Sequence, residues 1–229
     1  MDWKRVKSCV GEYALRLLPK KGIVGLGSGT TSEAFILHFA EYVTSHRLDL
    51  RCVASSIAIE QLATQLRLPL LTADKWQGMI DVTFDGADAI DSEGTAIKGG
   101  GGALLREKIV AGASKRVVYM VDERKWMKPW DSTPLPICII PFGASATLNH
   151  LDRGGFLGRI RMDGELPFTT DDGLWIVDLD LKPPLPSLSQ LDATLKSIPG
   201  VAETGIFFKY ASDIIVGDIS GTVTHHKVT

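Results

Sequence analysis

Residues 22–31 read GIVGLGSGTT, and this segment decides the fold. Its apolar residues and glycines up to Leu26 predict a short buried strand. A turn of glycines and hydroxyl residues follows, and apolar side chains at helical spacing then run from Phe35 to Val43. A buried strand that leads through a glycine-rich turn into a helix is typical of a parallel α/β sheet.

The same alternation of strand and helix continues on both sides of this segment. A helix is predicted over residues 3–18, where apolar residues have helical spacing and Pro19 and Gly22 follow. Further strands are predicted at 50–54, 68–71, 80–84 and 117–121, and further helices at 57–66 and 103–113. This order predicts a Rossmann-like parallel sheet with helices on both faces.

The pattern of the sequence changes after about residue 129, where prolines occur at 129, 134, 136 and 141. Strands are predicted at 134–140, 175–181 and 205–208, and helices at 144–151 and 188–198. We interpret this part as a smaller α+β (ferredoxin-like) domain, residues 130–205, with two helices on a sheet. Residues 1–129 and 206–229 form the predicted catalytic α/β domain, because 214–216 and 221–224 read as strands that return to the first sheet.

Composition narrows the functional class. Of the 229 residues, 45% are hydrophobic and 23% are charged, and the formal net charge is −2. This balance lacks the basic excess of nucleic-acid-binding proteins. No stretch reaches the roughly 20 apolar residues of a membrane span. Residues 1–5 are not followed by an apolar run, so we do not expect a secretory signal peptide. We therefore expect a cytoplasmic protein that binds neither nucleic acid nor membrane.

The turn at Ser28, Gly29, Thr30 and Thr31 is the first candidate for ligand binding. Glycines let backbone N–H groups face a ligand, the hydroxyls add donors, and a helix N-terminus adds partial positive charge. The pattern is neither a Walker A loop nor a complete dinucleotide fingerprint, because Thr30 stands where the last glycine would be. It predicts a phosphate cradle, and a tight turn with a threonine cap remains the alternative.

Residues Asp85, Gly86, Ala87 and Asp88 form the second candidate, at the carboxyl end of an apolar strand. Ligands of open α/β sheets bind at that edge, and two carboxylates there can exchange protons with sugar hydroxyls. The alternative is a polar Asx turn.

A run of four glycines, residues 99–102, is the third candidate. Lys98 precedes it, and the following helix carries Glu107. Four glycines lose much conformational entropy on folding, so Gly99, Gly100 and Gly101 are expected where the backbone must approach a ligand. A flexible linker is the alternative, although an apolar helix follows at once.

Two further lysines are candidates for binding an anion. Lys125 follows the strand at 117–121 and can reach a phosphate, unless it belongs to a solvated charged loop. Lys7, on the first helix, reads from its position alone as a surface lysine. The five histidines show no metal-ligand spacing on a common element, and no metal site is predicted.

Together these segments resemble the A-type ribose-5-phosphate isomerases. The family pattern has G-x-G-[ST]-G-[ST]-T, then D-G-A-D, then K-G-G-G with R-E on the next helix. The chain has these motifs at 25–31, 85–88, 98–101 and 106–107, in that order. Further matches at 55–56, 122–125, 198–201 and 213–217 extend the resemblance over nearly the whole chain. Ala89 and Ile57 depart from the usual polar residues, and Thr30 replaces a frequent serine.

The resemblance implies interconversion of D-ribose 5-phosphate and D-ribulose 5-phosphate in the pentose phosphate pathway, without a cofactor. It implies Glu107 as the base that takes the C2 proton, Lys98 as the cation that neutralises the enediolate, Asp85 in ring opening, and Asp88 in proton exchange on O1 and O2. The Ser28–Thr31 turn would hold the phosphate with Lys7 and Lys125. A homodimer or homotetramer is expected.

Two other functions remain open from the sequence. One is an amino-sugar-phosphate isomerase/deaminase on a similar fold, and the other is a non-catalytic sugar-phosphate sensor. A sensor of this kind usually carries an added DNA-binding segment, for which the chain has no spare length or basic patch.

Overall fold

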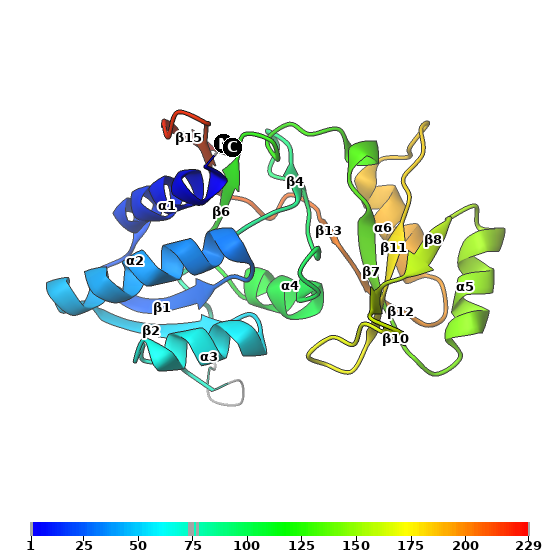
Figure 1. The fold of residues 1–229 in the computed structure, drawn as a ribbon, viewed down its shortest axis with the longest axis horizontal. Helices are drawn as coiled ribbons and strands as arrows, with labels where there is room; N and C mark the ends of the chain where they lie inside the picture. Colours follow the sequence, from blue (N-terminus) through cyan, green and yellow to red (C-terminus); the bar gives the residue numbers. More distant parts are fainter. Residues whose placement is uncertain (1, 73–75, 77, 229) are drawn as a thin grey trace.

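A computed structural model describes residues 2–72, 76 and 78–228 of the chain. Figure 1 shows two lobes, a larger one that contains the N-terminal elements and a smaller one that contains the middle of the chain, with α4 (Leu104–Gly112) and β13 (Ile206–Phe207) between them. The larger lobe contains a six-stranded sheet, and the smaller lobe contains a four-stranded sheet.

The six-stranded sheet is parallel except at one edge. Its strands are β1 (Lys21–Leu26), β2 (Asp49–Ala54), β3 (Val82–Asp85), β6 (Val117–Asp122), β14 (Asp213–Gly217) and β15 (Val223–Lys227). They lie in the order β15-β14-β6-β3-β1-β2, and only β15 is antiparallel to its neighbour. The predicted return of the last strands to the first sheet is confirmed.

Helices cover both faces of this sheet, as the alternating strands require. The helices are α1 (Trp3–Ala14), which continues as the short 3-10 helix η1 (Leu15–Leu17), α2 (Thr30–His46), α3 (Ile57–Gln65) and α4. On one face α1 and α2 pack over Val24 and Leu26 of β1. On the opposite face Val110 of α4 packs against Ile23 of the same strand. Successive residues of β1 therefore point into two different cores, one on each face of the sheet. This two-residue period is typical of a strand that is buried on both faces.

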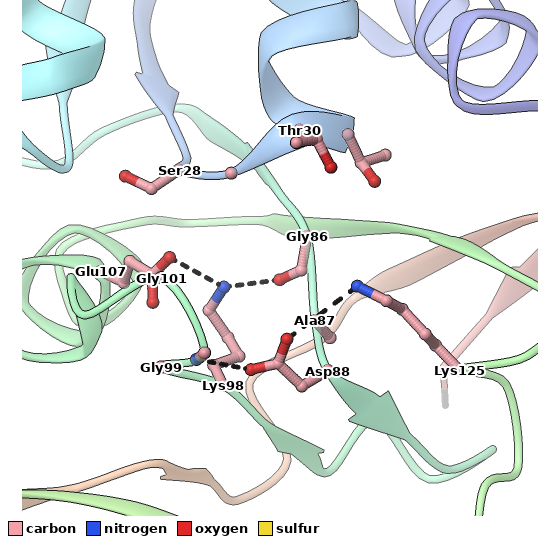
Figure 2. Close-up of a pocket in the computed structure, with 13 residues that line it drawn as sticks. Ser28, Thr30, Gly86, Ala87, Asp88, Lys98, Gly99, Gly101, Glu107 and Lys125 are labelled. Atoms are coloured by element: carbon pink, nitrogen blue, oxygen red, sulfur yellow. Dashed lines mark hydrogen bonds and ion pairs between the residues drawn. The ribbon is translucent and has the colours of Figure 1, made fainter. Parts of the chain in front are cut away.

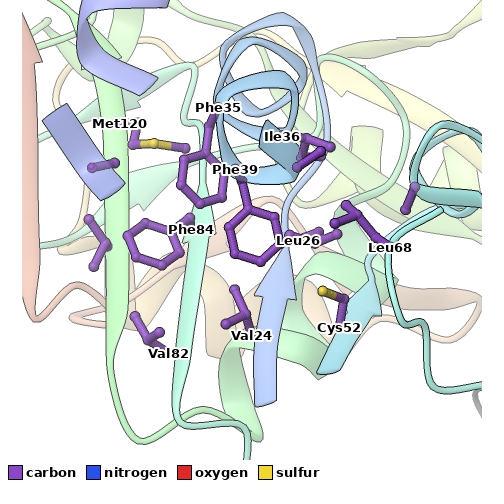
Figure 3. Close-up of a cluster of buried hydrophobic side chains, with 14 of the residues drawn as sticks. Val24, Leu26, Phe35, Ile36, Phe39, Cys52, Leu68, Val82, Phe84 and Met120 are labelled. Carbon is purple, nitrogen blue, oxygen red and sulfur yellow. The ribbon is translucent and has the colours of Figure 1, made fainter. Parts of the chain in front are cut away.

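An aromatic cluster anchors α2 on the sheet (Figure 3). The ring of Phe35 stacks on Phe84 of β3 at 4.5 Å between centroids and on Phe39 at 5.5 Å. All three side chains are fully buried. This packing fixes the N-terminus of α2 against the carboxyl ends of β1 and β3, where the candidate motifs lie.

The smaller lobe has the split β-α-β arrangement of ferredoxin-like folds. Its elements are β7 (Leu135–Ile139), α5 (Ala144–Arg153), β8 (Gly158–Ile160), β11 (Trp175–Leu179), α6 (Leu188–Lys196) and β12 (Val201–Thr204), preceded by the 3-10 helix η2 (Trp130–Ser132). The strands lie in the order β12-β7-β11-β8, and all neighbours are antiparallel. The predicted fold class is confirmed, and the exact domain boundaries stay a prediction.

Short strands join the two lobes and extend the smaller one. A three-stranded antiparallel sheet contains β4 (Ala89–Ile90), β5 (Ala96–Ile97) and β13. A two-stranded hairpin contains β9 (Met162–Asp163) and β10 (Leu166–Pro167). Ala89 is fully buried in the apolar cluster of the smaller lobe. The alanine that departs from the family pattern is therefore accommodated as part of this apolar core.

One predicted strand is wrong. Residues 68–71 make only an isolated bridge, between Leu70 and Cys52 of β2. The segment is apolar because Leu68 and Leu70 pack into the core beside α2 and α3, and burial alone produced the strand-like pattern.

Candidate active site

The candidate residues meet at the carboxyl ends of β1, β3 and β6, as expected for an open parallel sheet. They surround a cavity of about 250 Å³. Figure 2 shows these residues around that space. The lining residues are Ser28, Gly29, Thr30, Thr31, Gly86, Ala87, Asp88, Lys98, Gly99, Gly100, Gly101, Glu107 and Lys125. The structure thus brings together every candidate named from the sequence except Lys7 and Asp85, which lie just behind the lining.

Lys98 is the centre of a buried charge cluster. Its ammonium lies 3.0 Å from an Asp85 carboxylate oxygen and 3.3 Å from Oε1 of Glu107, and it donates to the Gly86 carbonyl at 2.5 Å. Only 2% of Lys98 is exposed. Burial by itself lowers the pKa of the Lys98 ammonium, but the carboxylates of Asp85 and Glu107 outweigh burial and raise it. Lys98 therefore stays charged across the physiological pH range.

Glu107 is a carboxylate with one oxygen engaged and one free. Oε1 faces Lys98, whereas Oε2 is buried and has no hydrogen-bond partner among the described residues. Burial raises the pKa of Glu107 to about 8, against the opposing effect of Lys98. A buried, unpaired carboxylate oxygen beside a cavity costs free energy, and such groups mark functional sites. Glu107 is thus placed to accept a proton from a bound molecule.

Asp85 organises the turn rather than facing the cavity. Its Oδ1 accepts hydrogen bonds from the backbone N–H groups of Ser28 and Gly86 at 3.0 and 2.7 Å, and from Ser32 Oγ at 3.3 Å. Its Oδ2 holds Lys98. A Cβ added at Gly27 would lie 2.1 Å from the Asp85 carboxylate, so only glycine permits this approach.

Asp88 and Lys125 stand on another wall of the cavity (Figure 2). Asp88 accepts a hydrogen bond from the Gly100 N–H at 2.8 Å, and its other oxygen lies 3.9 Å from the Lys125 ammonium. The glycine run is therefore held in contact with the site and is not a flexible linker. A Cβ on Gly102, where φ is +87°, would lie 2.5 Å from the Phe168 ring, which explains part of this glycine requirement.

The turn before α2 presents hydroxyls and a helix N-terminus to the cavity. Thr30 begins α2, and Lys7 of α1 donates to its hydroxyl at 2.7 Å. Ser28 Oγ lies 2.8 Å from the hydroxyls of both Ser55 and Ser56. A cation, several hydroxyls and the positive end of a helix form a site suited to a phosphate.

Sequence reasoning missed several residues that shape the site from a distance. Ser32 bonds Asp85, and Arg161 of the smaller lobe donates to the carbonyls of Gly99 and Gly100 at 2.9 and 3.0 Å. The rings of Tyr119 and Phe207 flank the Lys98 ammonium at 5.6 and 5.5 Å. No local motif marks these residues, because each acts through a contact with a distant segment.

The described residues offer neither a metal-binding cluster nor a membrane-spanning helix. Within residues 2–72, 76 and 78–228, no cluster of three or more His, Cys, Asp or Glu side chains is arranged to hold a metal ion. Among the helices of the same residues, none is long and apolar enough to cross a membrane.

Comparisons with known proteins decide the family. The family described as ribose 5-phosphate isomerase A (phosphoriboisomerase A) matches residues 51–221. Ribose-5-phosphate isomerase A of Dinoroseobacter shibae is 39% identical over 96% of this chain and 86% of its own length. The chain belongs to the ribose 5-phosphate isomerase A family. The resemblance inferred from the motifs is thereby confirmed.

Other relatives of this family match over nearly full length. Ribose-5-phosphate isomerase A of Limosilactobacillus reuteri is 35% identical over 99% of both chains. The ribose 5-phosphate isomerase structure from Plasmodium falciparum has a TM-score of 0.91 at 30% identity, over 98% of both chains. A D-ribose-5-phosphate isomerase structure in complex with phospho-erythronic acid has a TM-score of 0.90 at 31% identity, over 97% of both chains.

Proposed function

We propose that this protein interconverts D-ribose 5-phosphate and D-ribulose 5-phosphate through an enediolate, as a step of the pentose phosphate pathway. The observation that carries the proposal is the free Oε2 of Glu107, buried beside Lys98 on the wall of a cavity of about 250 Å³ that is lined by hydroxyl and charged groups. Family membership and the names of the relatives support the same reaction.

The reaction begins with the open-chain sugar, whose C1 is an aldehyde. Glu107 takes the proton from C2, the electron pair of that bond forms the C1=C2 double bond, and O1 gains the negative charge. The Lys98 ammonium, which is 2% exposed, stabilises this charge from a buried position, where an electrostatic interaction is stronger than in water. Glu107 then returns the proton to C1, and the O2 hydroxyl proton moves to O1, which leaves a ketone at C2 and a hydroxyl at C1.

Of the two aspartates, Asp88 is the one that lines the cavity, so we assign to it the proton movements on O1 and O2. The predicted part of Asp85 in ring opening becomes an indirect one, because Asp85 is 2% exposed and does not line the cavity. Asp85 holds Lys98 and the Ser28 N–H group in place instead. The phosphate would lie at the start of α2, with Thr30, Thr31, Lys7 and Lys125 around it.

A substrate panel tests the proposal. With EDTA present, ribose 5-phosphate should yield ketopentose, and glucosamine 6-phosphate should release no ammonia. Ammonia release would favour the amino-sugar-phosphate deaminase. If ribose 5-phosphate raised the melting temperature without any turnover, the protein would be a sensor and the proposed activity would be wrong.

The dependence of kcat/KM on pH should reveal the ionisation of Glu107 on its acidic side. A base must be deprotonated, and the pKa of Glu107 is raised to about 8, so kcat/KM should rise with pH up to that region and then level off. The phosphate of the substrate adds its own step at about pH 6. Initial rates at low substrate concentration from about pH 5 to about pH 10 give the profile. A rate that is already constant above the phosphate step would contradict the raised pKa.

The cytoplasmic location and the homodimeric or homotetrameric state also stay proposals. The expected absence of nucleic acid among the partners rests on the charge balance of the chain.

A further inference from the structure

A second cavity opens beside the candidate active site, on the far side of Asp88. Its volume is about 670 Å³, and it shares Asp88, Gly100 and Lys125 with the first cavity. Figure 2 shows the Lys125 ammonium facing the Asp88 carboxylate. The other lining residues are Arg124, Lys128, Thr133, Pro134, Pro136, Arg161 and Asp178. The proposed chemistry of a single pentose phosphate does not use this space.

The lining of this second cavity is cationic, with four basic side chains and two acidic ones. Some of the positive charge is already neutralised. The Arg161 guanidinium donates to both oxygens of Asp178, and Arg124 donates to both oxygens of Asp122 while stacking on Trp3 at 3.8 Å.

Two ammonium groups remain open to a ligand. Lys125 lies 3.9 Å from Asp88, which is too far for a strong hydrogen bond. Lys128 makes no ion pair within 4.0 Å among the described residues. Both follow β6 on one short loop, so they present unsatisfied cationic donors to the same space.

Thr133 supplies an independent observation. It lines the cavity just before β7, only 7% of it is exposed, and its hydroxyl oxygen is buried without a hydrogen-bond partner among the described residues. A buried hydroxyl without a partner is destabilising and calls for an explanation. A rotation of the Thr133 side chain that turns this hydroxyl toward the cavity would let a phosphate oxygen accept its hydrogen bond.

We propose that this cavity is a second anion subsite, which takes the outer phosphoryl group of a diphosphate whose inner phosphate occupies the Thr30–Thr31 turn. The position of the inner phosphate rests on the proposed function, whereas the outer one rests on Lys128, Thr133 and the shared Lys125. Diphosphates, free or esterified, would then compete with the substrate and bind more tightly than monophosphates.

Calorimetric titration with inorganic phosphate and inorganic pyrophosphate, at fixed ionic strength, tests the subsite without reliance on turnover. Losing one charge-assisted hydrogen bond should weaken pyrophosphate binding to Lys128→Gln about tenfold. Phosphate binding should change less than about twofold, because the turn holds a single phosphate. Lys20→Gln, which removes an exposed lysine at the opposite end of β1, is the matched control and should bind both anions as wild type does.

The proposal is overturned if Lys128→Gln binds pyrophosphate as wild type does, or if it loses affinity for both anions equally. A second variant, Thr133→Val, separates binding from folding. It should weaken pyrophosphate binding while the melting temperature stays the same or rises, since an unsatisfied hydroxyl is removed. A lowered melting temperature with unchanged pyrophosphate binding would make Thr133 purely structural and contradict its part in the subsite.

An ADP titration distinguishes the two sources of a diphosphate. Binding of ADP that depends on Lys128 assigns the subsite to esterified diphosphates. Lys128-dependent binding of pyrophosphate without any binding of ADP assigns it to the free anion.

Discussion

Glu107→Gln is expected to lower the turnover of ribose 5-phosphate about a thousandfold, within the range for loss of a general base. The amide has nearly the shape of the carboxylate, but it cannot accept the C2 proton. The effect should fall on kcat, because the Thr30–Thr31 turn and Lys125 still bind the phosphate end of the sugar. If the Thr30–Thr31 turn and Lys125 bind the phosphate as proposed, KM should change by only a few-fold, and steady-state kinetics with ribose 5-phosphate measures both constants.

Folding should survive this substitution. Burial raises the pKa of Glu107, so the fold favours its neutral form, and the neutral amide resembles that form; the melting temperature should therefore hold or rise. Glu165→Gln, on an exposed hairpin position, removes the same charge elsewhere and should leave kcat unchanged. Turnover near the wild-type value in folded Glu107→Gln would show that another group is the base.

Lys98→Met is expected to abolish turnover and to destabilise the fold by about 3 kcal/mol, because it leaves two buried carboxylates without their cation. Asp85 keeps three hydrogen bonds to its other oxygen, whereas Glu107 keeps none to its side chain from the described residues. Most of the lost free energy of unfolding should therefore come from the buried carboxylate of Glu107. Urea denaturation followed by fluorescence measures the free energy of unfolding.

The pH dependence of that loss has a definite sign. Without Lys98, the pKa of Glu107 in the folded protein rises further above its unfolded value. A raised carboxyl pKa means that stability is present at low pH and is lost as pH increases through the folded pKa. The gap in stability between wild type and Lys98→Met should therefore be larger at about pH 9 than at about pH 6.

A double variant provides the control for Lys98→Met. Lys98→Met with Glu107→Gln should be more stable than the sum of the two single effects predicts, since only one buried carboxylate is then left unpaired. If the double variant is destabilised by the sum of the two single effects, the two side chains are not coupled and the charge cluster is not the cause.

The lining of the site was predictable from sequence because each motif is local. Glycines and hydroxyls follow β1, two aspartates follow β3, and the carboxyl ends of parallel strands share one edge. Thus Ser28, Asp88 and Lys125 could be placed together before any coordinates. The resemblance to a family then supplied the role of Glu107, which helix periodicity alone would leave as one acid on α4.

The missed features are those that depend on tertiary contact. Arg161 reaches the glycine run from about 60 residues away in sequence, and nothing in its neighbourhood predicts that contact. The short strands β8, β9 and β10 lack a clear alternation of apolar and polar residues, so they gave no strand signal. At 68–71 a strand is predicted where the structure has none. This segment is apolar because it packs into the core, and not because it pairs in the sheet.

Proton NMR of ribose 5-phosphate in D₂O, with wild type and Glu107→Gln side by side and EDTA present, tests whether Glu107 transfers the proton between C2 and C1. We expect wild type to form ribulose 5-phosphate, with deuterium entering at C1 to the extent that the Glu107 carboxyl exchanges its proton with solvent before delivering it, and we expect Glu107→Gln to form no product. Conversion of ribose 5-phosphate by folded Glu107→Gln at the wild-type rate would contradict proton transfer through Glu107.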